Sequence, residues 1–342
     1  MKKFLYSAMC AAIIFLSAFG VTGCDTDVQD KRYVTLVGVT AAEVGVREDI
    51  DYFIMPEPAA STKVNAIETL KFSGNLQQIY GGESGYPQAV VVAKSNLISE
   101  YSFISDFIAE LEKGKEWLLS EKVSSNKIVE AVKNHLSEGM TPTFNAKNLS
   151  KAVIENCSVD FVYSSDCKSE IIGFMQTLNS VSETPFGTPE ESFFKDDKNF
   201  GSAIYSGKVN VYAPDGAPAL GIANLLSENK SFGGAEFEYN VVDAQTIQSY
   251  VANTDENKNA DICVLPVNIA VKLLGKGDRY KLLGTLTHGN LFMLSNSGKE
   301  ITQSNLHMLK GKKVGIVNIA QVPGLTFKSI LKNNDIAYTE LK

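Results

Sequence analysis

The sequence has few of the residues from which metal and redox sites are built. Only five of its 342 residues are Cys and only three are His. It contains no C-x-x-C pair and no His/Cys cluster at metal-ligand spacing, which argues against a metal site. It also lacks a G-x-S-x-G turn or a similar nucleophile motif. We therefore expect no metal, no cofactor and no catalytic residue.

Basic stripes and long apolar segments are missing from most of the chain. The net charge is −7, and no cluster of Lys and Arg indicates a nucleic-acid partner. After the first 23 residues, no segment approaches the ~20 apolar residues that a membrane-spanning helix needs. Hydrophobic residues make up 44% of the chain, which is enough for a large core. The length favours two soluble domains.

The N-terminus has the pattern of an export signal. Lys2 and Lys3 precede the apolar run Phe4–Phe19, and small residues lead to Cys24. A positive start, a short apolar segment and small residues before the cut define a secretory signal. A cysteine at the cut resembles a bacterial lipoprotein signal, so we expect residues 1–23 to be removed and Cys24 to be lipidated. The alternative is a plain signal peptide with a chance cysteine.

The other cysteines allow two interpretations. Cys157 and Cys167 are ten residues apart around a strand-like run, Val159–Tyr163. Because the chain is expected to be exported, a disulfide between them is possible, and two buried free thiols are the equal alternative. Cys263 lies within the apolar run Ile262–Leu265 and is expected in the core.

Strand-like and helix-like segments alternate along the chain. A short helix is expected at Thr40–Val44, and apolar residues at helical spacing predict helices through 96–181. The polar segment 183–208 is expected to be a surface connection. Strands separated by helix-length segments indicate a parallel α/β sheet. We expect strands at 34–39, 52–55, 89–93, 209–212, 237–242, 261–265, 291–294, 314–317 and 336–341.

The stretch Val211–Leu226 has the pattern of a ligand-binding turn. An apolar strand ends at Pro214-Asp215-Gly216, and apolar residues at helical spacing follow Pro218, which suits a first helical turn. Asp215 is expected to cap this helix. The N–H groups in the first turn of a helix have no partner within the helix. Where such a helix begins just after a strand, open α/β sheets bind small ligands. An ordinary strand–helix connection is the alternative.

Several segments resemble type II periplasmic solute-binding proteins of ABC importers. APDGAPALGIANLL, ADICVLPVNIAVKLL, YKLLGTLTHGNLFML and LKGKKVGIVNIAQVPGLTFKSIL, all in the second half of the chain, resemble the first half of that family. IDYFIMPEPAAST and YPQAVVVAKSNLISEYSFISDFIAEL resemble its second half. The similarity is to the branch of aliphatic-sulfonate, nitrate/taurine and thiamine-pyrimidine binders. Because the order of the segments is swapped, the chain resembles a circular permutant.

The resemblance implies an α/β fold with two lobes, each a parallel-rich sheet with flanking helices. Residues 25–88 and 294–342 would form one lobe. Residues 89–293, which include the helical region and the connection, would form the other. Two hinge strands, near Ala89–Ala93 and Leu291–Ser295, would join the lobes. Two tandem domains, each complete in itself, are the alternative.

The resemblance also implies a function. It predicts an exported lipoprotein on the outer face of the bacterial cytoplasmic membrane, a monomer that captures a small polar or anionic molecule between its lobes. It would deliver this ligand to ABC permease and ATPase subunits. A pyrimidine-synthase-like enzyme and a ligand sensor without transport are the alternatives. Loops at strand ends should offer N–H groups to the ligand. The expected ligand-binding residues are Thr40, Glu57, Pro214, Asp215, Gly216, Ala217, Pro266, Asn268, His288, Gln321, Pro323 and Gly324.

Overall fold

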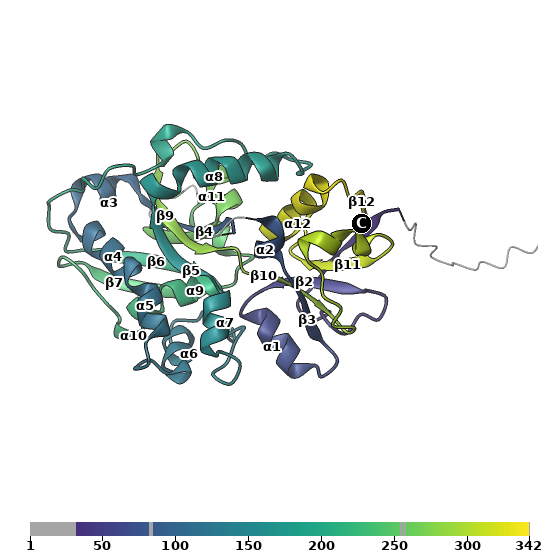
Figure 1. Ribbon diagram of the computed structural model, residues 1–342. Helices are drawn as coiled ribbons and strands as arrows, with labels where there is room; N and C mark the ends of the chain where they lie inside the picture. Colours follow the sequence, from purple (N-terminus) through teal and green to yellow (C-terminus); the bar gives the residue numbers. More distant parts are fainter. Residues whose placement is uncertain (1–31, 82–84, 254, 256–257, 342) are drawn as a thin grey trace, which may run out of the picture.

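The computed structural model describes residues 32–81, 85–253, 255 and 258–341, which form two six-stranded sheets (Figure 1). We call them the terminal sheet, which holds both ends of the described chain, and the central sheet, which is built from its middle. Helices flank both sheets, which confirms the expected α/β class and two-lobed architecture. Within the described residues, no helix is both long enough and apolar enough to cross a membrane.

The terminal sheet has the strand order β12-β1-β11-β2-β10-β3. β12, β1, β11 and β2 are parallel, whereas β10 is antiparallel to both of its neighbours. The inner strands are nearly continuous apolar runs, such as VTLVGV in β1, as is typical of strands covered on both faces. The bounds are β1 Val34–Val39, β2 Tyr52–Pro56, β3 Lys71–Asn75, β10 Leu291–Ser295, β11 Lys313–Val317 and β12 Tyr338–Leu341.

The central sheet has the strand order β5-β9-β4-β8-β6-β7. β7, β6 and β8 are parallel, and β4 is antiparallel to β8 and β9. The two sheets therefore share one plan, in which three parallel strands (β1, β11 and β2, or β7, β6 and β8) are followed by an antiparallel strand (β10 or β4) and a further strand (β3 or β9). β12 and β5 are additional edge strands outside this plan. The bounds are β4 Pro87–Lys94, β5 Val159–Tyr163, β6 Lys208–Pro214, β7 Glu236–Val242, β8 Ile262–Pro266 and β9 Tyr280–His288.

Amphipathic helices cover both sheets. In α4, for example, Phe103, Phe107 and Leu111 lie on one buried face. The helix expected at Thr40–Val44 is wrong, because this segment forms turns. The α-helices are α1 Ala59–Ala66, α2 Leu76–Tyr80, α3 Ser95–Glu100, α4 Phe103–Glu112, α5 Gly114–Leu119, α6 Ser125–Lys133, α7 Lys151–Asn156, α8 Ser164–Asn179, α9 Ala217–Gly221, α10 Ala223–Glu228, α11 Val267–Leu274 and α12 Val322–Asn333, and short 3₁₀ helices span Glu191–Phe193, Ile247–Tyr250 and Gln303–Leu309.

One apolar core extends across both halves of the molecule. Ile316 of the terminal sheet, Leu265 of the central sheet and Phe174 of α8 belong to the same cluster of buried residues. α12 is enclosed, since every residue from Val322 to Leu331 is buried and the helix contacts both α2 and α8. The two lobes therefore pack directly against each other in this structure.

The chain passes between the sheets at two segments that lie beside each other. One is Gly289-Asn290, between β9 and β10, and the other is Gly85-Tyr86, just before β4. A Cβ on Gly289 would lie 2.7 Å from side-chain atoms of both Gln77 and Tyr86. Glycine thus allows the two segments to approach this closely. The strands expected to cross, β4 and β10, begin just after these segments and each lie within one sheet.

The three cysteines within the described residues are free and buried. Cys157 belongs to the core cluster of the central lobe, whereas Cys167 belongs to the cluster shared by both lobes. The structure therefore has two separate thiols where a disulfide was considered from the sequence. Burial raises the pKa of the Cys157 thiol well above its usual value, which keeps it neutral. The export signal and Cys24 lie outside the described residues.

Candidate functional site

Polar residues from both sheets meet where parallel strands end. In the central sheet, β8 ends at Pro266, and α11 follows with Asn268 in its first turn. In the terminal sheet, β11 leads through a short loop to Gln321, which precedes α12. Asn268 Nδ2 donates a hydrogen bond to Gln321 Oε1 at 2.9 Å. The fold thus joins two of the expected ligand-binding side chains, one from each lobe.

Asn268 has an unused acceptor at this junction. The residue is fully buried, and its Oδ1 has no hydrogen-bond partner. A buried acceptor without a partner costs about 1–3 kcal/mol, and such groups are rare in native proteins. The oxygen is therefore a candidate contact for a ligand.

Glu57 follows β2 and contacts the crossing segment. Its N–H donates to Asn290 O at 2.9 Å, and Asn290 Nδ2 donates to Glu57 O at 3.1 Å. The Glu57 carboxylate accepts hydrogen bonds from Ser61 N at 2.9 Å and from Ser61 Oγ at 2.6 Å. Burial raises the pKa of the Glu57 carboxyl, and hydrogen bonds from Ser61 and from Asn156 of α7 oppose this rise. Glu57 therefore faces the central lobe as a buried acid.

The substitution Glu57→Gln is expected to stabilise the protein at neutral pH. A raised pKa means that the folded protein holds this proton more tightly than the unfolded chain. Protonated Glu57 therefore contributes its full stabilisation at pH values below the pKa that this carboxyl has in the unfolded chain. The contribution is lost as the pH rises through the pKa that it has in the folded protein. Gln keeps an acceptor for Ser61 N–H and has no charge to lose. Thermal unfolding should show a gain at pH 7 of about 1 kcal/mol, or about 2 °C in a protein of this size.

Glu130→Gln, on the exposed side of α6, is the matched control for this measurement. Surface substitutions of this kind usually change stability by less than about 0.5 kcal/mol. The control should therefore show no pH-dependent gain. A Glu57→Gln variant destabilised equally at acidic and neutral pH would contradict the assigned cost of the buried charge.

The turn Pro214-Asp215-Gly216-Ala217 joins β6 to α9, but Asp215 does not cap the helix. Gly216 occupies the N-cap position, with a φ of 100° that favours glycine, and no side chain caps α9. Asp215 Oδ1 accepts from Gly216 N at 2.8 Å, and Oδ2 accepts from Thr143 N at 2.7 Å. The carboxylate thus ties this turn to the segment before α7. Burial raises the pKa of the Asp215 carboxyl.

The segment bound by Asp215 also contacts the terminal lobe. Thr62 Oγ1 of α1 donates to Thr143 O at 3.2 Å, and Asn65 Nδ2 donates to Asn148 Oδ1 at 3.2 Å. Because Glu57 lies two residues before α1, it approaches this contact from the terminal lobe, and Asp215 approaches it from the central lobe. The two acids therefore flank one region of the lobe interface.

His288 borders a cavity within the central lobe. This cavity, of about 420 Å³, is lined by residues of α5, α7, β5 and the end of β9, and none of its lining residues comes from the terminal sheet. His288 Nε2 donates to Asp160 O at 3.2 Å, and its backbone N donates to Ser158 O. The structure thus places His288 next to the crossing segment, with its ring bonded inside one lobe.

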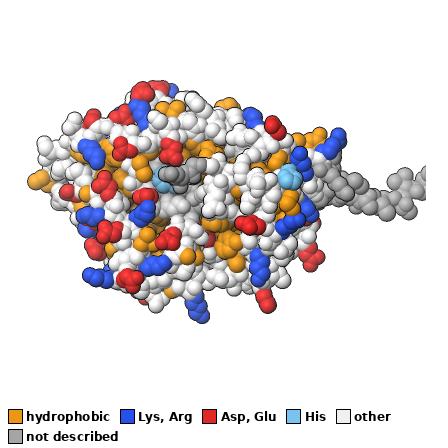
Figure 2. Space-filling model, viewed as in Figure 1, with side chains coloured by type: hydrophobic (Ala, Val, Ile, Leu, Met, Phe, Trp, Pro, Cys, Tyr) orange, Lys and Arg blue, Asp and Glu red, His pale blue; other side chains and the backbone are white. Residues whose placement is uncertain are grey.

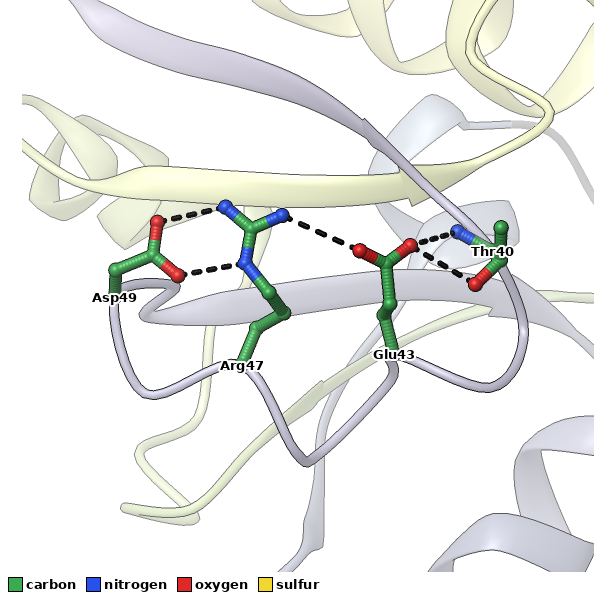
Figure 3. A network of polar contacts seen from close by, with 4 residues as sticks. All are labelled: Thr40, Glu43, Arg47 and Asp49. Carbon is green, nitrogen blue, oxygen red and sulfur yellow. Dashed lines mark hydrogen bonds and ion pairs between the residues drawn. The ribbon is translucent and has the colours of Figure 1, made fainter.

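Thr40 lies in an exposed loop that binds its own polar groups. Thr40 N and Thr40 Oγ1 both donate to the Glu43 carboxylate, at 2.7 and 2.9 Å (Figure 3). Arg47 continues the network from Glu43 to Asp49. The hydrogen bonds from Thr40 are the main cause that lowers the pKa of Glu43. The N–H that was expected to meet a ligand is therefore paired within the loop.

Pro323 and Gly324 lie in the first turn of α12, just after Gln321. Proline suits this turn because its missing N–H would have no partner in the helix. A Cβ on Gly324 would lie only 1.8 Å from Ile319 O. Gly324 therefore lets the loop fold back over the helix start and positions Gln321 through backbone packing.

The sequence reasoning missed Asn290, Ser61 and Asn156. Asn290 could have been found, since it is the polar residue between the apolar strands β9 and β10. Ser61 and Asn156 carry no comparable signal. Asn156 lies 99 positions after Glu57 and comes to it only through the packing of α7 against the terminal lobe.

Among the residues that the structure describes, no group of His, Cys, Asp and Glu side chains is arranged to hold a metal ion. No protein-family model matches the chain, and no curated protein matches it. Among solved structures, the chain is similar to the crystal structure of a phosphate ABC transporter, phosphate-binding protein from Streptococcus pneumoniae TIGR4. The identity is 10% over 79% of this chain and 77% of that chain, and the TM-score is 0.28. At these values, no residue role is transferred from that protein.

Proposed function

We propose that this protein captures a small polar molecule between its two lobes, as the solute-binding component of an ABC importer. The Asn268–Gln321 hydrogen bond carries the proposal, because it joins strand ends of the two sheets at a buried and incompletely paired position. Ligands of open α/β sheets bind outside the carboxyl ends of the strands. An entering ligand would replace this direct contact and satisfy Asn268 Oδ1.

The proposed lobes are residues 25–88 with 294–342, and residues 89–293. The membership of the two sheets supports this division except at its two boundaries, since β4 of the central sheet begins at Pro87 and β10 of the terminal sheet begins at Leu291. The two adjacent crossing segments would act as the hinge, since small changes of dihedral angle at a few such positions can close lobes as rigid bodies. The packed arrangement described above would correspond to the closed state.

The proposal includes export and lipidation at Cys24, and delivery of the ligand to a permease with its ATPase. It rests here on the leader pattern of residues 1–24. A lipid anchor would hold the protein on the outer face of the cytoplasmic membrane, close to the permease.

The shared plan of the two sheets supports a circular permutation. In the central sheet, the chain forms β6, β7, β8 and β9 in that order, and the antiparallel strand is β4. The equivalent strands of the terminal sheet are β11, β1, β2 and β3, with β10 antiparallel. This order is continuous only if the chain ends are joined between β11 and β1. Val34 of β1 pairs with Tyr338 of β12, so the two ends of the described chain lie side by side.

A ligand screen with a distance readout tests the proposed function. A ligand that binds only the folded state at one hundred times its Kd stabilises by about 2.7 kcal/mol, which thermal unfolding detects. Fluorescent labels at Glu68→Cys and Lys122→Cys, exposed positions of the two lobes, should approach each other when the ligand binds. The three buried native cysteines of the described residues should stay unlabelled.

A second label pair, Lys122→Cys with Glu236→Cys, lies within the central lobe and should report no change. This pair separates lobe closure from a general tightening of the protein. Tight binding with an unchanged distance between the lobes would contradict the two-lobed binding mechanism.

A further inference from the structure

Five segments at the strand ends that face the lobe interface contain acidic but no basic residues. Glu57 and Asp215 are their acidic residues, and none of the segments contains Lys or Arg. On the outer face shown in Figure 2, in contrast, acidic and basic side chains are mixed. These strand ends therefore have a negative bias, whereas lysines lie elsewhere at the interface, for example Lys332 of α12, whose Nζ donates to Ser180 O at 2.9 Å. The segments are 56–62, 214–220, 266–271, 288–290 and 318–325, each at or just after the end of a strand.

The same region has hydrogen-bond acceptors that lack donors. Asn268 Oδ1 and Asn290 Oδ1 have no partner, although the two residues are only 0% and 1% exposed. One N–H of each amide is used, by Gln321 Oε1 and by Glu57 O respectively. Each amide nitrogen keeps a second N–H, but the atoms without any partner in these two side chains are the oxygens. A molecule that satisfies these oxygens must supply donors.

The sheet register places the strand ends that carry Glu57, Asn268 and Asn290 near one another, and the turn of Asp215 follows β6, one strand beyond β8. Pro56 of β2 pairs with Leu291 of β10, which sets Glu57 next to Asn290. Pro266 of β8 pairs with a residue of β4, and β4 pairs on its other side with the end of β9, which leads to Asn290. Two strand spacings therefore separate the end of β8 from the end of β9, roughly 10 Å.

We propose that the ligand is a small organic cation that carries an ammonium, amidinium or guanidinium group. This inference rests on the proposed function of the inter-lobe site. Such a group brings several N–H donors for the asparagine oxygens and a positive charge for Glu57 and Asp215. An anion would meet two carboxylates and unpaired acceptors, with no Lys or Arg in these segments, and its burial would be costly. The proposal is thus a cationic ligand, where the sequence analysis had allowed an anionic one.

The environment of Glu57 and Asp215 predicts how ligand affinity depends on pH. Cys157 is the titratable group that faces Glu57, and Asp243 is the one that faces Asp215, so neither acid has a titratable cation as its partner. Burial raises the pKa of both carboxyls. A bound cation favours the ionised carboxylate and releases a proton. Affinity for a cation should therefore rise with pH, and affinity for an anion should fall.

The test uses the full chain and short-chain probes that differ in the charge of their end groups. Ethanolamine is compared with isethionate and ethylene glycol, and putrescine and agmatine are compared with succinate, by thermal unfolding and calorimetry. We expect a cation to bind and its affinity to rise from acidic to neutral pH, as the two carboxyls with raised pKa values ionise, while the anions have no effect. Glu57→Gln and Asp215→Asn should each weaken that cation about tenfold or more, since charge-assisted hydrogen bonds are the strong ones. Glu130→Gln should change nothing.

The outcomes separate this inference from the proposed function. Binding of an anion or a neutral probe that is unchanged in Glu57→Gln overturns the cationic ligand and leaves the inter-lobe site in place. Absence of binding in every charge class, with a constant distance between the labelled lobes, overturns the proposed function itself. Because Glu57→Gln is expected to be stable, its result holds even if Asp215→Asn fails to fold.

Discussion

Replacing Gly324 with Ala is expected to lower the free energy of unfolding by at least about 3 kcal/mol, a loss reserved for severe packing errors. The new Cβ would lie 1.8 Å from Ile319 O, far inside any contact distance. Because the obstacle is backbone, no side-chain rotation relieves it, and the loop before α12 must move. That loop carries Gln321, so the hydrogen bond to Asn268 should be lost as well. Chemical unfolding followed by circular dichroism measures the effect.

Gly173→Ala is the matched control. Gly173 also lies in a helix, α8, but on its exposed side, and no heavy atom lies within 4 Å of its virtual Cβ. Alanine is favoured over glycine inside a helix by roughly 0.5–1 kcal/mol, so this variant should be more stable than the natural protein. The same substitution thus has opposite signs at the two positions. Equal losses at both would refute the assigned contact with Ile319.

Replacing Asn268 with Leu is expected to weaken the tightest-binding member of the ligand panel about tenfold or more. The change removes the donor to Gln321 and the unpaired Oδ1, which is the group assigned to the ligand. A lost hydrogen bond to a buried, desolvated partner costs about 1–3 kcal/mol of binding free energy. The fold itself should lose about 1–3 kcal/mol, because leucine is branched like asparagine but larger, and it removes the donor to Gln321 together with the unsatisfied acceptor. Calorimetry and thermal unfolding measure the two effects separately.

Asn224→Leu distinguishes binding from stability. Asn224 is also a buried asparagine with one bonded donor, to Glu110 O at 2.8 Å, and an Oδ1 without a partner. It lies in α10, on the far side of the central lobe from the interface. This variant should bind the ligand as tightly as the natural protein does. If both substitutions reduced affinity equally, the reduction would reflect a general loosening of the fold and not a ligand contact at Asn268.

Most strands could be located from the sequence because their signal is local. β1 matches its expected range, and β7 and β11 each differ from theirs by one residue at the start. An unbroken apolar run between turn residues is sufficient to predict a strand covered on both faces. The helix at Thr40–Val44 failed for an equally local reason, since the side chain of Glu43 bonds the N–H of Thr40 in a turn.

The candidate site was only partly predictable. Asn268 and Gln321 were chosen because each follows a strand, and this rule finds loops at one edge of a sheet. The rule cannot say where each side chain points. Thr40 also follows a strand, yet its donors are bound within its own loop. Asp215 follows a strand as well, yet its carboxylate binds the segment at Thr143 and does not cap α9.

The sequence by itself determined where most of the strands lie, although β3 and β9 were not predicted, and that the chain is an α/β protein. It also indicated which segments reach the strand ends, because periodicity and turn residues act over a few neighbours. Only the tertiary structure decided which ends face each other. The contacts Asn268–Gln321 and Glu57–Asn290 join residues 53 and 233 positions apart. Their partners, burial and unpaired oxygens depend on how two separately built sheets pack, and no local pattern encodes that packing.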